Sequence, residues 1–293
     1  MKLIQTIESY LSLVKFSHSV FAMPFALIGF FVASRTDQFH PLNLEILLLI
    51  VLCMITARNA AMAFNRWADR DYDSRNRRTA QREIPSGIVT PRSALIFVGL
   101  NSVAFIIFAW FINKPCFYLS PVALIIVLGY SYTKRFSWLC HVFLGLALSL
   151  APVGAYLAVT SSFNLIPLLY GISVVSWVAG FDVLYALQDI EFDRSEKLKS
   201  IPSRFGIQKS LWISECFHLI CAAAIVTCGL LLHLEFGLSY WMGTGTLMFL
   251  ILLVYQHRII SGNHLERINL AFFTTNGIAS IVIAFFTILD FYF

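Results

Sequence analysis

Two short acidic motifs contain the side chains best suited to chemistry. The first motif consists of Asn65, Asp69 and Asp73, which are spaced i, i+4, i+8. On an α-helix this spacing puts three oxygen-bearing side chains on one face, with a drift of only about 40° per step. Asp71 lies between them and would point elsewhere. We therefore predict that one helix face presents a row of oxygen ligands.

The second motif consists of Asp189 and Asp193, with Asp182 seven residues before Asp189 on the same predicted helix face. Clustered carboxylates repel one another, and near a membrane they are costly unless they are paired or metal-bound. Two such faces opposite each other would form a site for Mg²⁺, which prefers a few carboxylates together with phosphate oxygens. The simpler interpretation is a pair of solvated helix ends that bind nearby arginines. Two matching rows of carboxylates favour a metal and diphosphate site.

Cations follow both motifs and fit the same chemistry. A diphosphate needs metal bridging and direct cationic donors, which Arg and Lys supply. The preference for positive loops on one side of a membrane would also place many cations here. The cations after the first motif are Arg75, Arg77, Arg78 and Arg82, and those after the second are Arg194, Lys197, Lys199 and Arg204. From these we select Arg78 and Arg204 as candidate diphosphate ligands.

Three other cations lie at positions that call for an explanation. Lys134 ends an apolar stretch on the side of the motifs, so it is a candidate to bind diphosphate and stabilise the leaving group, with membrane anchoring as the alternative. Arg58 lies inside an apolar stretch, seven residues before Asn65 and hence on the same face. A charge within the membrane indicates function by default, although a structural ion pair would also account for Arg58. Arg58 and Arg135 are candidate partners for a carboxylate on an acceptor substrate.

The composition shows what kind of elements must position these residues. Of the 293 residues, 58% are hydrophobic and 13% are charged, whereas soluble domains carry about 25% charged residues. These values exclude a disordered chain, a nucleic-acid-binding domain and an ordinary cytosolic enzyme. The six cysteines are scattered without a Cys-x-x-Cys pattern, so we expect free thiols. The sequence predicts an all-α membrane protein in contact with the lipid bilayer, with no nucleic-acid partner and no evident obligate protein partner.

Nine apolar stretches are candidates to cross the bilayer, which requires about 20 residues. The fourth stretch is short, and only residues 113–116 divide it from the third, so eight or ten spans are alternatives. Two connectors, about 65–93 and 188–210, are longer than the others and contain the two motifs. The predicted spans are 13–33, 44–64, 94–112, 117–132, 139–159, 165–187, 211–232, 237–256 and 270–289.

The distribution of positive charge predicts the orientation. With nine spans and a cytoplasmic N-terminus, 18 of the 21 Lys and Arg residues fall on the cytoplasmic side and two on the other. Such a bias is typical of cytoplasmic loops. We therefore predict one integral domain over residues 1–293 in the cell inner (plasma) membrane, with both motif loops in the cytoplasm. No separate soluble domain is expected because the remaining loops are short.

The two motifs resemble those of the UbiA-type intramembrane aromatic prenyltransferases, and the resemblance covers essentially the whole chain. It is greatest to the bacterial 4-hydroxybenzoate polyprenyltransferase-like group. The familiar Asn-Asp-x-x-Asp form of the first motif is not kept, because Arg66 occupies its second position. Three further segments carry the resemblance, namely residues 15–26, Tyr132-Thr133-Lys134 and residues 200–206.

The resemblance implies nine helices around a central cavity, with the motif loops over its cytoplasmic mouth. It also implies transfer of a polyprenyl group from an allylic polyprenyl diphosphate to a ring carbon of an aromatic hydroxy acid. We expect the acceptor to be 4-hydroxybenzoate in quinone biosynthesis, with 1,4-dihydroxy-6-naphthoate in a menaquinone route as the alternative. In this hypothesis Mg²⁺ would be held by Asn65, Asp69, Asp73, Asp189 and Asp193.

The hypothesis also gives roles to the remaining candidates. Lys134, Arg78 and Arg204 would stabilise the charge of the leaving diphosphate. Asp182, deeper on the same face as the second motif, would accept the ring proton. A membrane transporter of an anionic solute is the rival from another class, but the acidic rows would repel an anion without metal. A membrane phosphotransferase acting on alcohols is disfavoured because its Gly-Ala-Arg pattern between carboxylates is missing.

Overall fold

The computed structural model describes residues 9–14, 21–36, 42–238, 240–260 and 274–293. Within these ranges the regular elements are helices and no strand occurs, as the sequence predicts. The elements are α2 (Met23–Thr36), α3 (Leu44–Ala68), α4 (Arg70–Arg75), α5 (Pro91–Ile112), α6 (Lys114–Thr133), α7 (Cys140–Thr160), α8 (Leu165–Ala186), η2 (Leu187–Asp189), α9 (Ile190–Ser195), α10 (Ile201–Phe236), α11 (Tyr240–Ile260) and α12 (Asn276–Leu289).

Seven of the described helices are long and apolar enough to cross a membrane. They are α3, α5, α6, α7, α8 with its η2–α9 continuation, α10 and α11, and they match the second to eighth predicted spans. The shorter apolar helices α2 and α12 lie at the first and ninth predicted positions. Both predicted spans extend into residues outside the described ranges, as does the segment 15–26. The polytopic all-α class is therefore confirmed, whereas the count of nine stays a prediction.

The α5–α6 junction is tighter than the sequence indicates. Asn113 ends α5, and α6 begins immediately afterwards with a proline in its first turn. The Asn113 side chain accepts a hydrogen bond from the Cys116 N–H at 2.8 Å and donates to the carbonyls of Leu157 and Ala158 on α7. This capping satisfies otherwise unpaired backbone groups, so the fourth span is 20 residues long rather than short.

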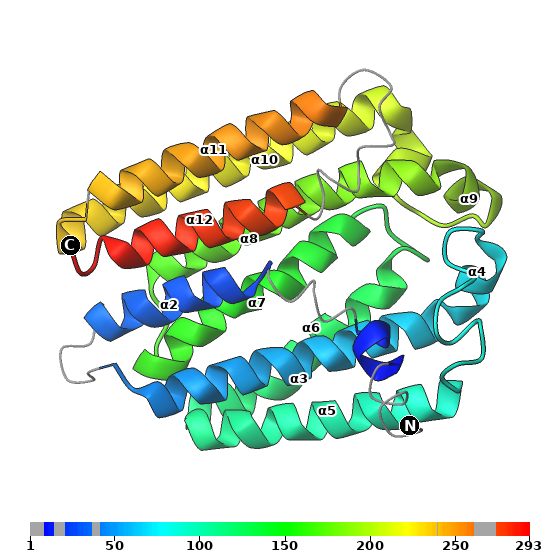
Figure 1. Ribbon diagram of the computed structural model, residues 1–293, viewed down its shortest axis with the longest axis horizontal. Helices are drawn as coiled ribbons and strands as arrows, with labels where there is room; N and C mark the ends of the chain where they lie inside the picture. The colour runs from blue at the N-terminus through cyan, green and yellow to red at the C-terminus, as the bar shows by residue number, and fades with distance from the viewer. Residues whose placement is uncertain (1–8, 15–20, 37–41, 239, 261–273) are drawn as a thin grey trace.

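The helices run roughly along the long axis of the molecule (Figure 1). Helix α3 packs against α5 and α6, α7 packs against α2, α6 and α8, and α8 packs against α10. Helix α12 packs between α2 and α11. Of the seven long apolar helices, α8 is the most deeply buried, and its Trp177 contacts Phe25 and Phe249 with ring centroids 5.4 and 5.9 Å apart. The helix that carries Asp182 and leads into the second motif is therefore fixed in the aromatic core.

Both motifs lie at one end of the helix bundle, here called the motif end, where α4 and α9 appear at the right of Figure 1. Helix α3 leads into α4 through Asp69, and α8 leads into α9 through η2. Helix α10 starts close by and is interrupted at Gly206, whose φ of 75° favours a residue without a side chain. The two predicted motif loops are thus built from short helices and turns that continue the long helices.

Candidate functional site

The first motif keeps its side chains on one face despite a break in the helix. Asp69 separates α3 from α4, with φ −92° and ψ 2°. Its N–H still donates to the Asn65 carbonyl at 2.9 Å, and the Asp73 N–H donates to the Asp69 carbonyl at 2.8 Å. Because the i to i−4 hydrogen bonds continue through the break, the helical register is kept. Asp71 faces solvent, with 73% of its side chain exposed.

Asp69 is a buried carboxylate surrounded by donors. Only 4% of its side chain is exposed, and the Lys134 ammonium lies 2.9 Å from Oδ2. The Asn65 amide donates to the same oxygen at 3.2 Å, and the Arg135 guanidinium lies 3.6 Å from Oδ1. Oδ1 itself accepts no hydrogen bond from the described residues. Lys134 and Arg135 therefore contact the first motif directly, and Asp69 retains one oxygen available for a further ligand.

Asp73 is paired within its own loop. The Arg82 Nη1 atom donates to both carboxylate oxygens of Asp73, at 2.7 and 2.9 Å. The Thr79 hydroxyl donates to the Asp73 carbonyl at 3.1 Å and holds the loop against the end of α4. Asp73 is buried, with a side-chain exposure of 8%, so a charged partner is needed to offset its desolvation.

The second motif is joined to the loop of the first through Asp189. Arg78 donates from Nε and Nη2 to the two Asp189 oxygens, and the Asn76 amide donates to Oδ1 at 3.2 Å. Burial tends to lower the pKa of Arg78, but the hydrogen bonds and charge of Asp189 outweigh it and hold that pKa above its usual value. Arg78 also donates to the Tyr185 hydroxyl at 3.0 Å. The loop that follows the first motif is thus in direct contact with the second motif.

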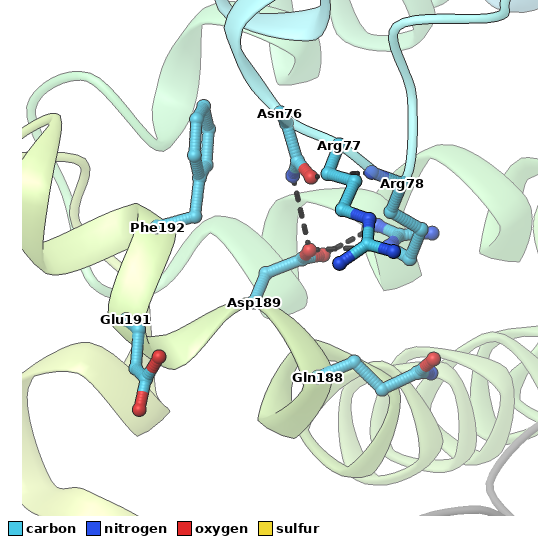
Figure 2. A pocket seen from close by; sticks show the side chains of 7 residues that line it. All are labelled: Asn76, Arg77, Arg78, Gln188, Asp189, Glu191 and Phe192. Carbon is cyan, nitrogen blue, oxygen red and sulfur yellow. Dashed lines mark hydrogen bonds and ion pairs between the residues drawn. The ribbon is translucent and has the colours of Figure 1, made fainter.

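A cavity of about 550 Å³ lies where these segments meet (Figure 2). Asn76, Arg77 and Arg78 line it from the first loop. The lining from the second segment comprises Gln188, Asp189, Glu191 and Phe192. Cations and carboxylates share the walls of this cavity, so it suits a ligand that carries both anionic groups and a metal ion.

Asp193 is positioned by the beginning of α10. Its Oδ2 accepts a hydrogen bond from the Ser200 hydroxyl at 2.7 Å. The same hydroxyl accepts from the Ser203 N–H at 3.2 Å, and Ser203 in turn caps the backbone of Ser200. Asp193 is therefore held by a helix cap, whereas Asp69, Asp73 and Asp189 are held by cations.

Asp182 has a partner that sequence reasoning missed. His141 Nδ1 lies 2.7 Å from Asp182 Oδ2, and the Ile201 N–H donates to His141 Nε2 at 3.3 Å. His141 is the second residue of α7 and is buried, whereas 22% of the Asp182 side chain is exposed. The one available signal was the position of His141 at the start of a predicted span, on the same side as the motifs.

Two of the predicted cations lie elsewhere. The Arg204 guanidinium stacks over the Trp138 ring at 3.7 Å from its centroid, and within the described residues it forms no ion pair with the carboxylates of the motifs. Arg58 donates to the Val14 carbonyl at 3.1 Å, below the first motif on α3. The geometry therefore brings Lys134, Arg135, Arg78 and Arg82 to the carboxylates, but it does not bring Arg204 there.

A divalent metal ion fits the chemistry of this site. The motifs offer carboxylate and amide oxygens, which hard cations prefer, and Asp69 Oδ1 is buried without a hydrogen bond. In the part of the chain that the structure describes, no three His, Cys, Asp or Glu side chains converge as a ready metal cluster. The carboxylates instead contact Lys134, Arg82 and Arg78. Binding of a metal would thus require these cations to turn to another anion.

The comparisons with known proteins agree with this geometry. A sequence model of the UbiA prenyltransferase family matches residues 22–278. The chain is 33% identical over 247 residues to the 4-hydroxybenzoate octaprenyltransferase of Nitrosospira multiformis, covering 83% of this chain and 82% of that protein. It is 30% identical over 242 residues to the enzyme of the same name from Aliivibrio fischeri, covering 81% of each.

Solved structures show the same fold. The apo structure of a UbiA homologue from Aeropyrum pernix K1 superposes with a TM-score of 0.82 and 31% identity, covering 93% of this chain and 98% of that one. A UbiA homologue from Archaeoglobus fulgidus, bound to GPP and Mg²⁺, superposes with a TM-score of 0.72 and 19% identity, covering 97% and 99%. The all-helical architecture of this chain is therefore the one that these proteins share.

Proposed function

This chain belongs to the UbiA prenyltransferase family, and we propose that it transfers a polyprenyl group from an allylic polyprenyl diphosphate to 4-hydroxybenzoate. The products are diphosphate and a C-prenylated aromatic acid that serves quinone biosynthesis. Support for the acceptor comes from relatives named 4-hydroxybenzoate octaprenyltransferase at about 30% identity. Support for the donor comes from the homologue bound to GPP and Mg²⁺.

The observation that carries the proposal is the alternation of carboxylates and cations at the motif end. Asp69 contacts Lys134, Asp73 contacts Arg82, and Asp189 contacts Arg78. A magnesium diphosphate presents the complementary set, since its metal seeks carboxylates and its oxygens seek cations. When such a ligand binds, each pair can exchange partners without leaving a buried charge unpaired.

Mg²⁺ would be held by the oxygen-bearing side chains of the two motifs, namely Asn65, Asp69, Asp73, Asp189 and Asp193. The bound metal would polarise the diphosphate oxygens and neutralise charge on the leaving group. Lys134 and Arg78 would donate to the same diphosphate oxygens as the allylic C–O bond breaks. Arg82 joins this group because of its contact with Asp73. Arg204 receives no such role because it stacks on Trp138.

The acceptor carboxylate and the ring proton are assigned to three further residues. Arg58 or Arg135 would pair with the acceptor carboxylate, and Asp182 would take the proton from the substituted ring carbon. Arg58 is inside α3 and Asp182 inside α8, so both lie further from the motif end than the metal ligands. We place the motif end in the cytoplasm, at the inner membrane, because the Lys and Arg residues gather in its loops.

Purified protein in lipid provides the test. It is incubated with Mg²⁺ and a medium-chain allylic diphosphate, and with either 4-hydroxybenzoate or 1,4-dihydroxy-6-naphthoate. We expect a prenylated 4-hydroxybenzoate by mass spectrometry, and its formation should be lost on chelation of Mg²⁺. If only the naphthoate is prenylated, the naphthoate is the acceptor instead of 4-hydroxybenzoate, and the proposed prenyl transfer reaction still holds. Absence of product with both acceptors, together with absence of Mg²⁺-dependent diphosphate binding, would refute the proposal.

A further inference from the structure

A buried histidine lies behind the carboxylate to which we assign the ring proton. His141 is 2% exposed, and both of its ring nitrogens are engaged. Nδ1 faces Asp182 Oδ2 at 2.7 Å, and Nε2 faces the Ile201 N–H at 3.3 Å. The contact joins the start of α7 to α8 on one side and to the first residue of α10 on the other. His141 therefore has no free atom with which to touch a substrate.

The backbone contact determines where the histidine proton lies. A backbone N–H can only donate, so Nε2 of His141 must act as the acceptor and carry no hydrogen. The proton of the neutral imidazole is then on Nδ1, from which it is donated to Asp182. This donation stabilises the charged form of the carboxylate. The direction of the Ile201 hydrogen bond therefore sets the tautomer of His141 and directs its Nδ1–H at Asp182 Oδ2.

The same contact leaves one carboxylate oxygen open. Oδ2 of Asp182 is occupied by His141, and Oδ1 accepts no hydrogen bond from the described residues. Asp182 is partly exposed, unlike His141. Asp182 precedes Asp189 by seven residues, about 10 Å along a helix, which separates it from the second motif.

We propose that His141 is a positioning residue for the prenyl transfer reaction, which holds Asp182 by its Oδ2 and leaves Oδ1 to accept the proton of the substituted ring carbon. This inference rests on the proposed function. The allylic C–O bond breaks with its electron pair leaving on diphosphate, and the ring carbon forms the new C–C bond. The C–H electron pair then restores the aromatic ring, and the released proton binds Asp182 Oδ1. No further reactant is required.

The proposal predicts which substitutions preserve the arrangement. In His141→Ala, Asp182 loses its donor and the Ile201 N–H loses its acceptor. In His141→Gln, an amide NH₂ and an amide oxygen replace the donor and the acceptor without introducing a charge. We expect His141→Ala to lower kcat by about 10- to 100-fold, as for other residues that orient a functional side chain. His141→Gln should recover most of this loss, and KM for the allylic diphosphate should be unchanged in both.

A ring-deuterated acceptor separates positioning from simple structural support. The acceptor, 4-hydroxybenzoate or the naphthoate if that is the one used, carries deuterium at the carbon that is prenylated. The wild-type protein should show no kinetic isotope effect, because proton loss from the cationic ring is fast. His141→Ala and Asp182→Asn should show a primary isotope effect, because proton removal becomes limiting. The buried His218 contacts His257 and the Trp177 carbonyl but no carboxylate of the site. It provides the matched control in His218→Gln, with unchanged kcat and no isotope effect.

The possible results are distinguishable. If wild-type protein forms no prenylated product with either acceptor and does not bind diphosphate with Mg²⁺, the proposed function fails, and the role of His141 fails with it. If the wild type is active and folded His141→Ala keeps full kcat without an isotope effect, the positioning role is refuted. If His141→Ala does not fold, Asp182→Asn decides the question, since full kcat in that variant also refutes the role. Retained Mg²⁺-dependent binding of inorganic diphosphate shows that a variant is folded.

Discussion

The two acidic motifs occupy equivalent places at the ends of α3 and α8, yet they are stabilised in different ways. Asp69 and Asp73 have side-chain exposures of 4% and 8% and contact the cations Lys134 and Arg82. Asp189 is more exposed, at 19%, and its cation Arg78 comes from the loop of the first motif. Asp193 has a hydroxyl partner, Ser200. The first loop therefore supplies cations to both motifs, and the second loop supplies none to the first among the contacts described.

This difference predicts that the two regions respond to a ligand at different cost. The buried ion pairs of the first motif are costly to break on one side only, because a desolvated charge would be left alone. The Arg78–Asp189 contact is closer to solvent, so water screens the attraction between its charges. We infer that Arg78 and Asp189 exchange partners at a lower cost than the buried pairs of the first motif.

Removal of a first-motif carboxylate should produce the largest effect. We expect Asp69→Asn to lower kcat by about 10³-fold, because it removes a metal ligand and leaves Lys134 without its counter-charge. Asp189→Asn should cost less, because its position is more exposed. Steady-state assays with Asp71→Asn as the matched control check this, since Asp71 faces solvent. If Asp189→Asn lowered kcat more than Asp69→Asn does, the second motif, and not the first, would contribute more to catalysis.

Loss of the Lys134 ammonium should rank second. Lys134→Gln keeps a hydrogen-bond donor near Asp69 but removes the charge, so we expect a loss of about 10²-fold in kcat/KM for the allylic diphosphate. Lys199→Gln is the control, because Lys199 is at the same end but donates to the Phe136 carbonyl instead. Binding of inorganic diphosphate measured by calorimetry should weaken only in Lys134→Gln. Equal binding in the two variants would place Lys134 outside the diphosphate site.

The contact between the loops should rank third. Arg78→Ala removes a guanidinium that bridges Asp189 and Tyr185, and we expect about a 10-fold rise in KM for the allylic diphosphate with a smaller change in kcat. Arg75→Ala is the matched control, because Arg75 forms the more exposed ion pair with Glu196 at 2.8 Å. Exposed pairs contribute about 0–1 kcal/mol to stability. A similar rise in KM for Arg75→Ala would mean that loop closure in general, and not Arg78, governs binding.

The sequence was sufficient to predict the helices and the shared face of the motif residues. It was not sufficient to predict which side chains pair with the carboxylates. The apolar stretches and the i, i+4 spacing are local, so the long helices and the row of Asn65, Asp69 and Asp73 could be predicted. Pairing of cations with particular carboxylates is a tertiary property. Arg78 and Asp189 are 111 residues apart, and His141 and Asp182 are 41 apart. Arg204 was assigned to the diphosphate by nearness in sequence, whereas packing places it on Trp138.

The smallest effect should come from the helix cap that holds the second motif. Ser200→Ala removes the acceptor for the Ser203 N–H and the donor to Asp193, so we expect a loss of about 1 kcal/mol in stability and a modest loss of activity. The control is Thr90→Ala, which removes an equivalent cap on α5, where the Ser93 N–H donates to the Thr90 hydroxyl at 3.1 Å. It should lower stability as much as Ser200→Ala does, without lowering activity. Thermal unfolding and kcat measured on both variants check this. Equal activity in the two would show that Asp193 needs no support from α10, and it would leave the cations of the first loop as the main determinants of the site.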